Sequence, residues 1–200
     1  MELLLATRNK NKIIEMSAFL KRLGLKIRTL EDFPDAPDVV EDGKSFEENA
    51  VKKALACAKY TGLLTLADDS GLMVDALSGA PGVNSHRFAG PKATDFENNM
   101  KLLDQMKNLD ASRRTAKFVC CIAVANKDRI IRTVTGKCDG IILTEPRGRE
   151  GFGYDPLFMK ADYKKTFAEL SLEIKNRISH RAMALEKASL AIESHLLTLL

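Results

Sequence analysis

The chain alternates between short apolar runs with strand character and longer amphipathic segments with helical spacing, and this alternation restricts its fold more than any other feature. Such a pattern builds a sheet covered by helices, whereas repeated elements of one type build bundles or sandwiches. The strand-like runs are Glu2 to Ala6, Leu63 to Ala67, Thr115 to Ala125 and Arg129 to Cys138. The turn-forming tripeptide 126–128 joins the last two, which predicts an antiparallel hairpin.

The helical segments carry N-terminal signals. A hydroxyl residue three positions before a glutamate is a capping box, and this pattern occurs at Ser45/Glu48, Thr94/Glu97 and Thr166/Glu169. Further apolar stripes predict helices over Asn11 to Leu23 and His180 to Leu197. Glycine-bearing loops are expected over Asp68 to Gly90 and Gly148 to Pro156. We therefore predict an α/β fold with a mixed sheet, forming a single domain over residues 1–200.

Composition narrows the class of protein only slightly. Lys and Arg number 31 against 27 Asp and Glu, and the resulting net charge of +4 suits a small anionic ligand as well as a weak nucleic-acid contact. The four cysteines form no CxxC pair and have no histidine at zinc-ligand spacing, so we interpret them as reduced thiols. No apolar run approaches a signal peptide or the roughly 18 to 20 residues of a membrane span. These features favour a soluble cytoplasmic protein without a membrane partner.

The turn after the first predicted strand is rich in groups that bind anions. Backbone N–H groups at a helix N-terminus favour phosphate, and the turn adds a hydroxyl, amides and cations. The P-loop pattern GxxxxGK[ST] is absent. The alternative is an ordinary capped turn with solvated lysines. The residues concerned are Thr7, Arg8, Asn9, Lys10, Asn11 and Lys12.

Two adjacent carboxylates, Asp68 and Asp69, follow the second strand-like run, where their mutual repulsion needs compensation. Mg²⁺ is a suitable compensating ion because it binds through one or two carboxylates together with substrate phosphates. Alternatively, one of the two merely caps the turn at Ser70-Gly71. Glu41 is the further metal-ligand candidate, since the capping box accounts for Glu48. Asn49 and Lys53 lie four residues apart on the same helix face, and both are either phosphate contacts or solvated.

The segment 151–156 places aromatic residues and a carboxylate in a glycine-flexed loop. The Phe152 ring can stack on a nucleobase, and the Asp155 carboxylate can accept hydrogen bonds from ring N–H groups. The alternative is a tight structural turn. Near the start of the last helix, Lys175, His180 and Arg181 can donate to a purine carbonyl or to phosphate.

Six ordered motifs make the chain resemble the inosine triphosphate pyrophosphatases over nearly its whole length. They are ATRNKNK, FEENAVKKA, LADDSGL, GAPGVNSHRFAG, GFGYDPLF and SHR. The resemblance implies hydrolysis of dITP, ITP and XTP to the nucleoside monophosphate and pyrophosphate. It also implies an elongated mixed sheet with helices in two lobes, a nucleotide cleft between the lobes, and a homodimer.

The resemblance also assigns roles to residues. Asp69 would accept a proton from the attacking water and bind Mg²⁺ with Glu41, while Asp68 supports the site. Donors around the base would favour a 6-oxo purine over adenine, because a donor facing an exocyclic amine stays unpaired. One departure is Asn11, where many relatives carry glycine. The substrate contacts implied are Thr7 to Lys12 and Lys53 for phosphates, Ser70 for positioning, Phe152 for stacking, Gly153, Tyr154 and Asp155 for the pocket, and Lys175, His180 and Arg181 for the base.

Two alternative functions remain open at this point. One is a pyrophosphatase for modified pyrimidine nucleotides, against which the SHR motif after GFGYDP argues. The other is a non-catalytic nucleotide or RNA-binding module, which gives no reason for Asp68 and Asp69 near a phosphate backbone. We therefore predict an enzyme with a purine nucleoside triphosphate substrate and no stable nucleic-acid partner.

Overall fold

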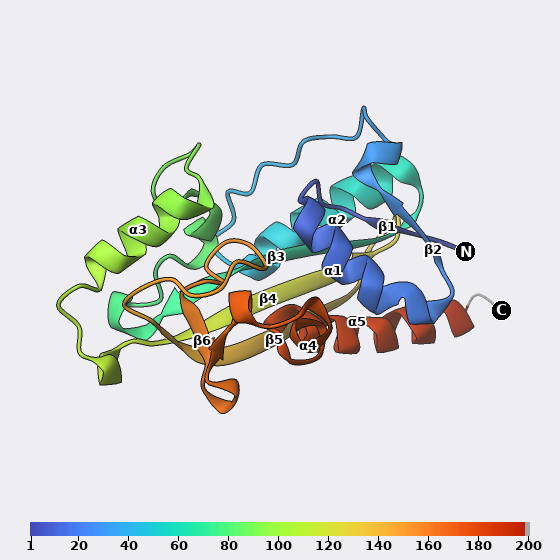
Figure 1. Ribbon diagram of the computed structural model, residues 1–200. Coiled ribbons are helices and arrows are strands. Elements are labelled where there is room, and N and C mark those ends of the chain that lie inside the picture. Colours follow the sequence, from blue (N-terminus) through green and yellow to red (C-terminus); the bar gives the residue numbers. More distant parts are fainter. Residues whose placement is uncertain (199–200) are drawn as a thin grey trace. The chain divides into compact units, whose positions relative to one another are not determined.

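The computed structural model describes residues 1–198, and its strands form one seven-stranded sheet in the order β2-β1-β3-β4-β5-β6-β7 (Figure 1). Strand β1 pairs in parallel with both β2 and β3, whereas β6 pairs antiparallel with β5 and β7. The sheet is therefore mixed, which confirms the sequence prediction. The strands are β1 (Glu2–Leu5), β2 (Lys26–Thr29), β3 (Leu64–Val74), β4 (Thr115–Ala125), β5 (Ile130–Ile142), β6 (Phe158–Lys160) and β7 (Lys165–Thr166).

The capping signals found in the sequence are used in the structure. The Thr94/Glu97 box is complete, and Thr166 and Glu169 close a box around a 3-10 turn. Ser45 caps its helix, but the Glu48 carboxylate accepts from the Lys44 N–H in place of the cap residue. Within residues 1–198, no helix is long and apolar enough to cross a membrane. The α-helices are α1 (Lys10–Leu20), α2 (Phe46–Thr61), α3 (Asp95–Gln105), α4 (Leu172–Ile178) and α5 (His180–Leu197).

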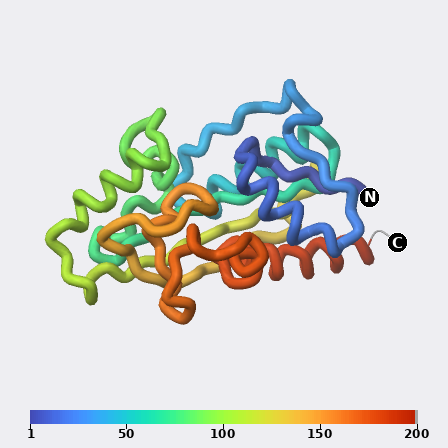
Figure 2. Tube along the Cα trace, viewed as in Figure 1, coloured from blue at the N-terminus to red at the C-terminus, as the bar shows by residue number. Residues whose placement is uncertain are grey.

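The chain divides into two compact units, each built from separate stretches of sequence. The first unit comprises Met1–Asp69, Cys120–Gly136 and the chain from Arg181 on. The second unit comprises Ser70–Val119 and Lys137–His180. The trace in Figure 2, coloured by residue number, follows the chain through these stretches in order. Strands β3, β4 and β5 each contribute residues to both units.

In the first unit, β1 is buried on both faces. Leu3 and Leu5 pack in a cluster with α1 and α5, whereas Leu4 packs in a second cluster with α2. Since successive side chains of a strand point to opposite faces, one strand supplies both clusters. This burial explains why the run reads as continuously apolar without polar alternation.

The second unit has one apolar cluster, which contains aromatic side chains of β4, β6 and the loop before β6. Phe118 lies with its ring centroid 4.6 Å from that of Phe158 and 5.8 Å from that of Phe167. Leu102 of α3 and Tyr154 belong to the same cluster. The cluster therefore anchors α3 and the glycine-bearing loop 151–156 to one core.

The predicted end of the second strand-like run is wrong. We expected a strand over Leu63 to Ala67 and then a loop, whereas β3 continues through residue 74. Asp and Gly are depleted in strands, and this propensity concealed the extension. Here ion pairs compensate the buried charge of Asp68. The absence of a side chain at Gly71 lets Ser85 lie close to the strand, since a Cβ there would lie 2.3 Å from Ser85 Oγ. Similarly, β5 runs four residues past the predicted end at Cys138.

Candidate active site

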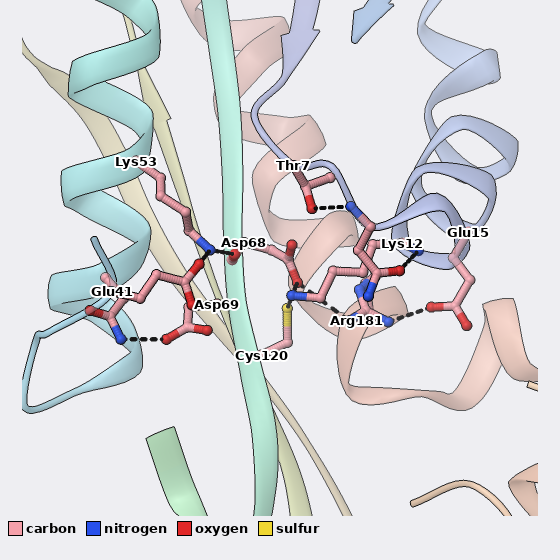
Figure 3. A network of polar contacts seen from close by, with 11 residues as sticks. Thr7, Lys12, Glu15, Glu41, Lys53, Asp68, Asp69, Cys120 and Arg181 are labelled. Carbon is pink, nitrogen blue, oxygen red and sulfur yellow. Dashed lines mark hydrogen bonds and ion pairs between the residues drawn. The ribbon is translucent and has the colours of Figure 1, made fainter. Parts of the chain in front are cut away.

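The adjacent carboxylates Asp68 and Asp69 lie within β3 and project from opposite faces of the strand (Figure 3). Both side chains are buried, with residue exposures of 0% and 6%. Strand geometry separates them, because consecutive side chains alternate between the two faces of a sheet. The two carboxylates therefore have separate sets of partners.

Asp68 faces cations from α1 and from the start of α5. Its Oδ2 atom lies 3.0 Å from Lys12 Nζ and 3.3 Å from Arg181 Nη2, and both cations are largely buried. Arg181 also pairs through Nη1 with the buried carboxylate of Glu15. Burial opposes ionisation of Asp68, but these cations outweigh burial and hold the pKa of its carboxyl well below the usual range. Asp68 is therefore ionised at neutral pH and serves as the anionic partner of these cations.

Asp69 faces α2 and the segment before it. Its Oδ2 atom accepts a 2.8 Å hydrogen bond from Asn49 Nδ2. Asn49 is fully buried, and its Oδ1 atom accepts from the Gly43 N–H at 2.8 Å. A Cβ at Gly43 would lie 2.6 Å from that Oδ1, so glycine is needed for this approach. Asn49 thus orients the Asp69 carboxylate and ties the loop of Glu41 to the helix.

Lys53 lies one helical turn after Asn49 and links the remaining groups of this cluster. Its Nζ atom donates to the main-chain oxygen of Asp68 at 2.5 Å and lies 2.5 Å from Glu41 Oε1 (Figure 3). Despite burial, the negative charges of Asp68, Glu41 and Asp69 raise the pKa of Lys53. The ammonium therefore stays charged among the carboxylates.

Burial is the main cause of a raised pKa at Asp69, and the nearby negative charge of Glu41 adds to it. Lys53 and the Asn49 hydrogen bond act in the opposite direction without cancelling the increase. A carboxylate with a raised pKa is a better proton acceptor than an ordinary surface aspartate. Asp69 has the environment of a general base.

The turn 7–12 forms the N-terminus of α1. Thr7 Oγ1 accepts from the Asn9 N–H at 3.2 Å, and Asn9 Oδ1 accepts from the Lys12 N–H at 3.1 Å, so Asn9 is the helix cap. The first turn of α1 contains no acidic residue. Arg8, Lys10 and Asn11 are exposed, whereas Lys12 turns inward to Asp68. At this positive helix end the Lys10 cation is exposed to solvent, and Arg8 Nε lies 3.9 Å from Asp38 Oδ1 in an exposed ion pair.

The donor set for a metal ion is small. Within residues 1–198, no group of three His, Cys, Asp or Glu side chains is arranged to hold a metal. Glu41 and Asp69 interact electrostatically, and both contribute carboxylate oxygens close to Lys53. Two carboxylates fit a hard divalent cation that takes its remaining ligands from substrate and water. A site for a soft, fully protein-coordinated metal does not fit this set.

The second unit holds the predicted aromatic loop. Asp155 Oδ2 accepts from the Phe152 N–H at 2.9 Å and lies 2.5 Å from Lys175 Nζ of α4. A Cβ at Gly151 would lie 2.1 Å from this oxygen, so only glycine lets the carboxylate fold back. Lys175 Nζ also lies 4.8 Å from the centroid of the Phe152 ring. The structure thus brings together three of the predicted base-site residues.

The other residues predicted as substrate contacts in this part of the chain make contacts that are typical of a structural role. Tyr154 is buried in the core and its hydroxyl donates to the Ser85 main-chain oxygen at 2.9 Å. Burial raises the pKa of this phenol. His180 stacks on Phe118, with ring centroids 4.7 Å apart. Ser70 is half-buried in β3.

Arg181 and His180, neighbours in sequence, fall in different units, with Arg181 contacting the Asp68 cluster of the first. Sequence reasoning missed Glu15, the buried partner of Arg181. It also treated Asn49 as a possible phosphate contact, whereas the Asn49 amide binds Asp69. A charged residue beside the apolar stripe of α1 was the available signal for Glu15, because a buried charge requires a partner.

Comparison with known proteins identifies relatives over nearly the full length. The sequence profile of the Ham1 family matches residues 3–190. A dITP/XTP pyrophosphatase from Desulforamulus reducens is 53% identical over 188 residues, which cover 94% of each chain. A dITP/XTP pyrophosphatase from Geobacter sulfurreducens is 52% identical over 183 residues, covering 92% of each chain.

Solved structures show the same fold. A HAM1 protein from Coxiella burnetii superposes with a TM-score of 0.87 at 44% identity, covering 97% of this chain and 99% of the other. The Ham1 protein of Staphylococcus aureus gives a TM-score of 0.86 at 38% identity, covering 98% and 100% of the two chains. The mixed sheet flanked by helices is therefore the fold of these proteins.

Proposed function

The chain belongs to the Ham1 family, and from this premise we infer that it is a nucleoside-triphosphate pyrophosphatase for non-standard purine nucleotides such as dITP, ITP and XTP. The reaction breaks the anhydride bond between the α- and β-phosphates with water and releases the nucleoside monophosphate and pyrophosphate. It would remove non-standard nucleotides from the precursor pool. The observation that carries the proposal is the paired arrangement around β3, where Asp68 pairs with Lys12 and Arg181 while Asp69, from the opposite face, accepts from Asn49.

Asp69 is the general base of the proposed reaction. Its carboxylate accepts a proton from the attacking water. The Asn49 amide orients one carboxylate oxygen through its 2.8 Å hydrogen bond. Asp68 supports the site by holding Lys12 and Arg181 in place with its ion pairs.

Glu41 and Asp69 would hold a divalent cation, which we propose to be Mg²⁺, since two carboxylates plus phosphate oxygens satisfy its preference for hard oxygen ligands. When bound, Mg²⁺ neutralises phosphate charge and polarises phosphoryl oxygens. Lys53 keeps its positive charge beside these carboxylates, which limits their mutual repulsion. The same ammonium is a candidate contact for the triphosphate.

The N-terminus of α1 would bind the phosphates of the substrate. Its exposed N–H groups and the positive helix end favour anions, and side chains add charge and directional donors. The Asn9 cap keeps the turn in the required conformation despite asparagine at position 11. The proposed contacts are Thr7, Arg8, Asn9, Lys10, Asn11, Lys12 and Lys53, with Ser70 as a further positioning residue.

The second unit would contribute the stacking surface for the purine. The half-buried Phe152 ring is the proposed surface, and Gly153, Tyr154 and Asp155 shape the loop that presents it. Lys175, His180 and Arg181 are the proposed donors that favour a 6-oxo purine. Such a donor facing the 6-amino group of adenine would stay unpaired, at a cost of about 1 to 3 kcal/mol. ATP is therefore expected to be a poor substrate.

We also propose that the chain acts as a single functional domain, that it forms a homodimer, and that it works in the cytoplasm. The profile match supports the first point because it runs through both units. The family resemblance supports the homodimer, which sedimentation velocity of the purified protein can test. The cytoplasmic location follows from the nucleotide pool that supplies the substrate.

The decisive experiment measures pyrophosphate release from ITP, XTP, GTP and ATP in parallel, with Mg²⁺ and with excess EDTA. We expect metal-dependent release from ITP and XTP and little release from ATP or GTP. Release that persists in EDTA would contradict the metal site at Glu41 and Asp69. No release from any purine, but release from a modified pyrimidine triphosphate, would replace the proposed substrate class.

A further inference from the structure

Helix α3 holds the backbone of Gly153 at both of its polar groups. Asp95 Oδ2 accepts from the Gly153 N–H at 2.7 Å, and Asn99 Nδ2 donates to the Gly153 carbonyl oxygen at 2.9 Å. The two side chains are four residues apart and therefore share one face of the helix. An acceptor and a donor on one helix face thus match the donor and acceptor of a single residue.

Gly153 lies between Phe152 and Tyr154 and adopts a φ of +62°, in the left-handed region. This conformation directs the chain from the half-buried Phe152 toward the core residue Tyr154. The bond from Phe152 N–H to Asp155 closes the loop internally, but it leaves the Gly153 polar groups for another partner. Asp95 and Asn99 fill that role from outside the loop.

Helix α3 is itself anchored firmly. Leu102 is fully buried in the core of the second unit. Asn98 accepts from the Ala89 N–H at 2.7 Å and donates to the His86 oxygen at 3.0 Å. At the other end, the buried Arg114 donates to the Met106 oxygen at 2.7 Å. The helix is therefore a rigid reference for the loop.

Asp95 and Asn99, which together form a clamp on the Gly153 main chain, are not required for the fold of α3. Asp95 is exposed, and Asn99 is half-buried with its carbonyl oxygen accepting no hydrogen bond within residues 1–198. The Thr94/Glu97 box already caps the helix. The polar side-chain atoms of Asp95 and Asn99 that form these hydrogen bonds are therefore those that contact Gly153. This indicates that the two residues fix the conformation of the loop 151–156.

We propose that Asp95 and Asn99 are positioning residues that set the orientation of the base-stacking Phe152 through the main chain of Gly153. The inference rests on the proposed function, in which Phe152 stacks on the purine. Base affinity then depends on this clamp, whereas the chemistry at Asp69 does not. Loss of the clamp is expected to raise KM and leave kcat nearly unchanged.

The test uses three variants at Asp95 and Asn99 and one control variant, all in the full chain. Asn99→Asp keeps the size of the side chain but replaces the donor with a carboxylate that repels the Gly153 oxygen. Asp95→Ala removes the acceptor, whereas Asp95→Asn retains an oxygen that can accept from the Gly153 N–H. Asp104→Asn, an exposed carboxylate of α3 paired with Lys107, is the matched control.

We expect Asn99→Asp to raise KM for ITP about tenfold and Asp95→Ala about fivefold, the ratios for losing one hydrogen bond of average strength. The KM for ITP of Asp95→Asn and of Asp104→Asn should stay within about twofold of the KM of the unmodified protein. Inhibition by IMP, which carries the base, should weaken in parallel with KM. Inhibition by pyrophosphate, which lacks the base, should not change.

Several outcomes would overturn the inference. Unchanged KM in Asn99→Asp and Asp95→Ala, or equal weakening of IMP and pyrophosphate inhibition, would show that the clamp does not act on the base. Failure of Asp95→Asn to restore KM would show that the Asp95 acceptor is not the relevant group. If Asn99→Asp does not fold, as judged by thermal unfolding, the Asp95 pair decides alone. If the unmodified protein does not hydrolyse ITP, the proposed function fails first and this inference fails with it.

Discussion

Each unit contains a largely buried ion pair, Lys12 with Asp68 in the first and Lys175 with Asp155 in the second. The two pairs differ in the elements that hold the carboxylate in place. Asp68 lies inside a regular strand and meets cations that helices supply. Asp155 lies in a glycine-bearing loop and also accepts a main-chain N–H. Buried charges on regular elements have little freedom to move, whereas a loop keeps its shape through a few individual hydrogen bonds.

This difference predicts a division of kinetic effects. Substitutions in the first unit should act on turnover and stability, because the carboxylates there perform the proposed chemistry and compensate buried charge. Substitutions in the second unit should act on KM and on the choice of base. The following four predictions test this division, from the largest expected effect to the smallest.

Asp69→Asn should lower kcat for ITP by about 10³-fold, since the amide cannot accept the proton of the attacking water. The Asn49 hydrogen bond can persist through the new amide oxygen, so the fold should be retained. Pyrophosphate release measures kcat, and thermal unfolding is the control. Turnover within tenfold of the unmodified protein would remove Asp69 from the role of base.

Asp68→Asn should lower the free energy of unfolding by about 3 to 5 kcal/mol, because Lys12 and Arg181 lose the buried charge that they pair with. The pKa of Asp68 is lowered in the folded state, so its contribution is full above the ordinary aspartate pKa and is lost as the pH falls toward the folded value. Urea unfolding from pH 7 to pH 3 measures this. The variant should show a weaker loss of stability over that range.

Asp104→Asn is the control for Asp68→Asn, because it removes an exposed carboxylate that pairs with Lys107. Its unfolding free energy should change by less than about 1 kcal/mol. An equal effect of the two substitutions would contradict the importance of burial at Asp68.

Phe152→Ala should raise KM for ITP by roughly 10- to 100-fold with little change in kcat, because stacking on an aromatic ring contributes about 1 to 3 kcal/mol per base. Inhibition by pyrophosphate should be unaffected. Tyr163→Ala, at a partly exposed aromatic residue of the same unit, should leave KM unchanged. A lower kcat at unchanged KM in Phe152→Ala would place this loop with the chemistry and break the comparison.

Arg181 lies in the first unit but is a proposed donor to the base, so it is the exception to this division, and Arg181→Ala should narrow the ratio of kcat/KM between ITP and ATP by about tenfold. Since Arg181 also pairs with Asp68, turnover of both nucleotides should fall together, and the ratio separates the two effects. Arg177→Ala, at an exposed position of α4, is the control. An unchanged ratio with reduced stability would assign Arg181 to the first unit's charge cluster alone.

Much of the candidate site could be predicted from the sequence because its residues fall in compact motifs. The phosphate turn, the aspartate pair and the aromatic loop each lie within a few consecutive residues. Only the family resemblance separated the role of Asp69 from that of Asp68, because the predicted strand ended before them and a shared cation accounted for both. In the structure, β3 continues, and its two faces give the carboxylates different partners.

The clamp on Gly153 could not be predicted for a related reason. Asp95 and Asn99 lie 58 and 54 residues from their partner, and neither belongs to a motif with the loop. An i, i+4 polar pair on a helix usually faces solvent. Only the packing of α3 in the second unit brings this pair to the main chain of the loop.

By itself, the sequence determined the α/β class, the mixed sheet and the helix caps, because alternation and capping depend on neighbours a few residues apart. The tertiary structure decided which groups each carboxylate faces, and therefore the physical reason for the separate roles that the resemblance implied for Asp68 and Asp69. Asp68 and Arg181 are 113 residues apart, and against the effect of burial the cations of Lys12 and Arg181 lower the pKa of Asp68, whereas burial and the charge of Glu41 raise the pKa of Asp69. Such long-range electrostatics depend on the folded positions of charges and leave no local signal in the chain.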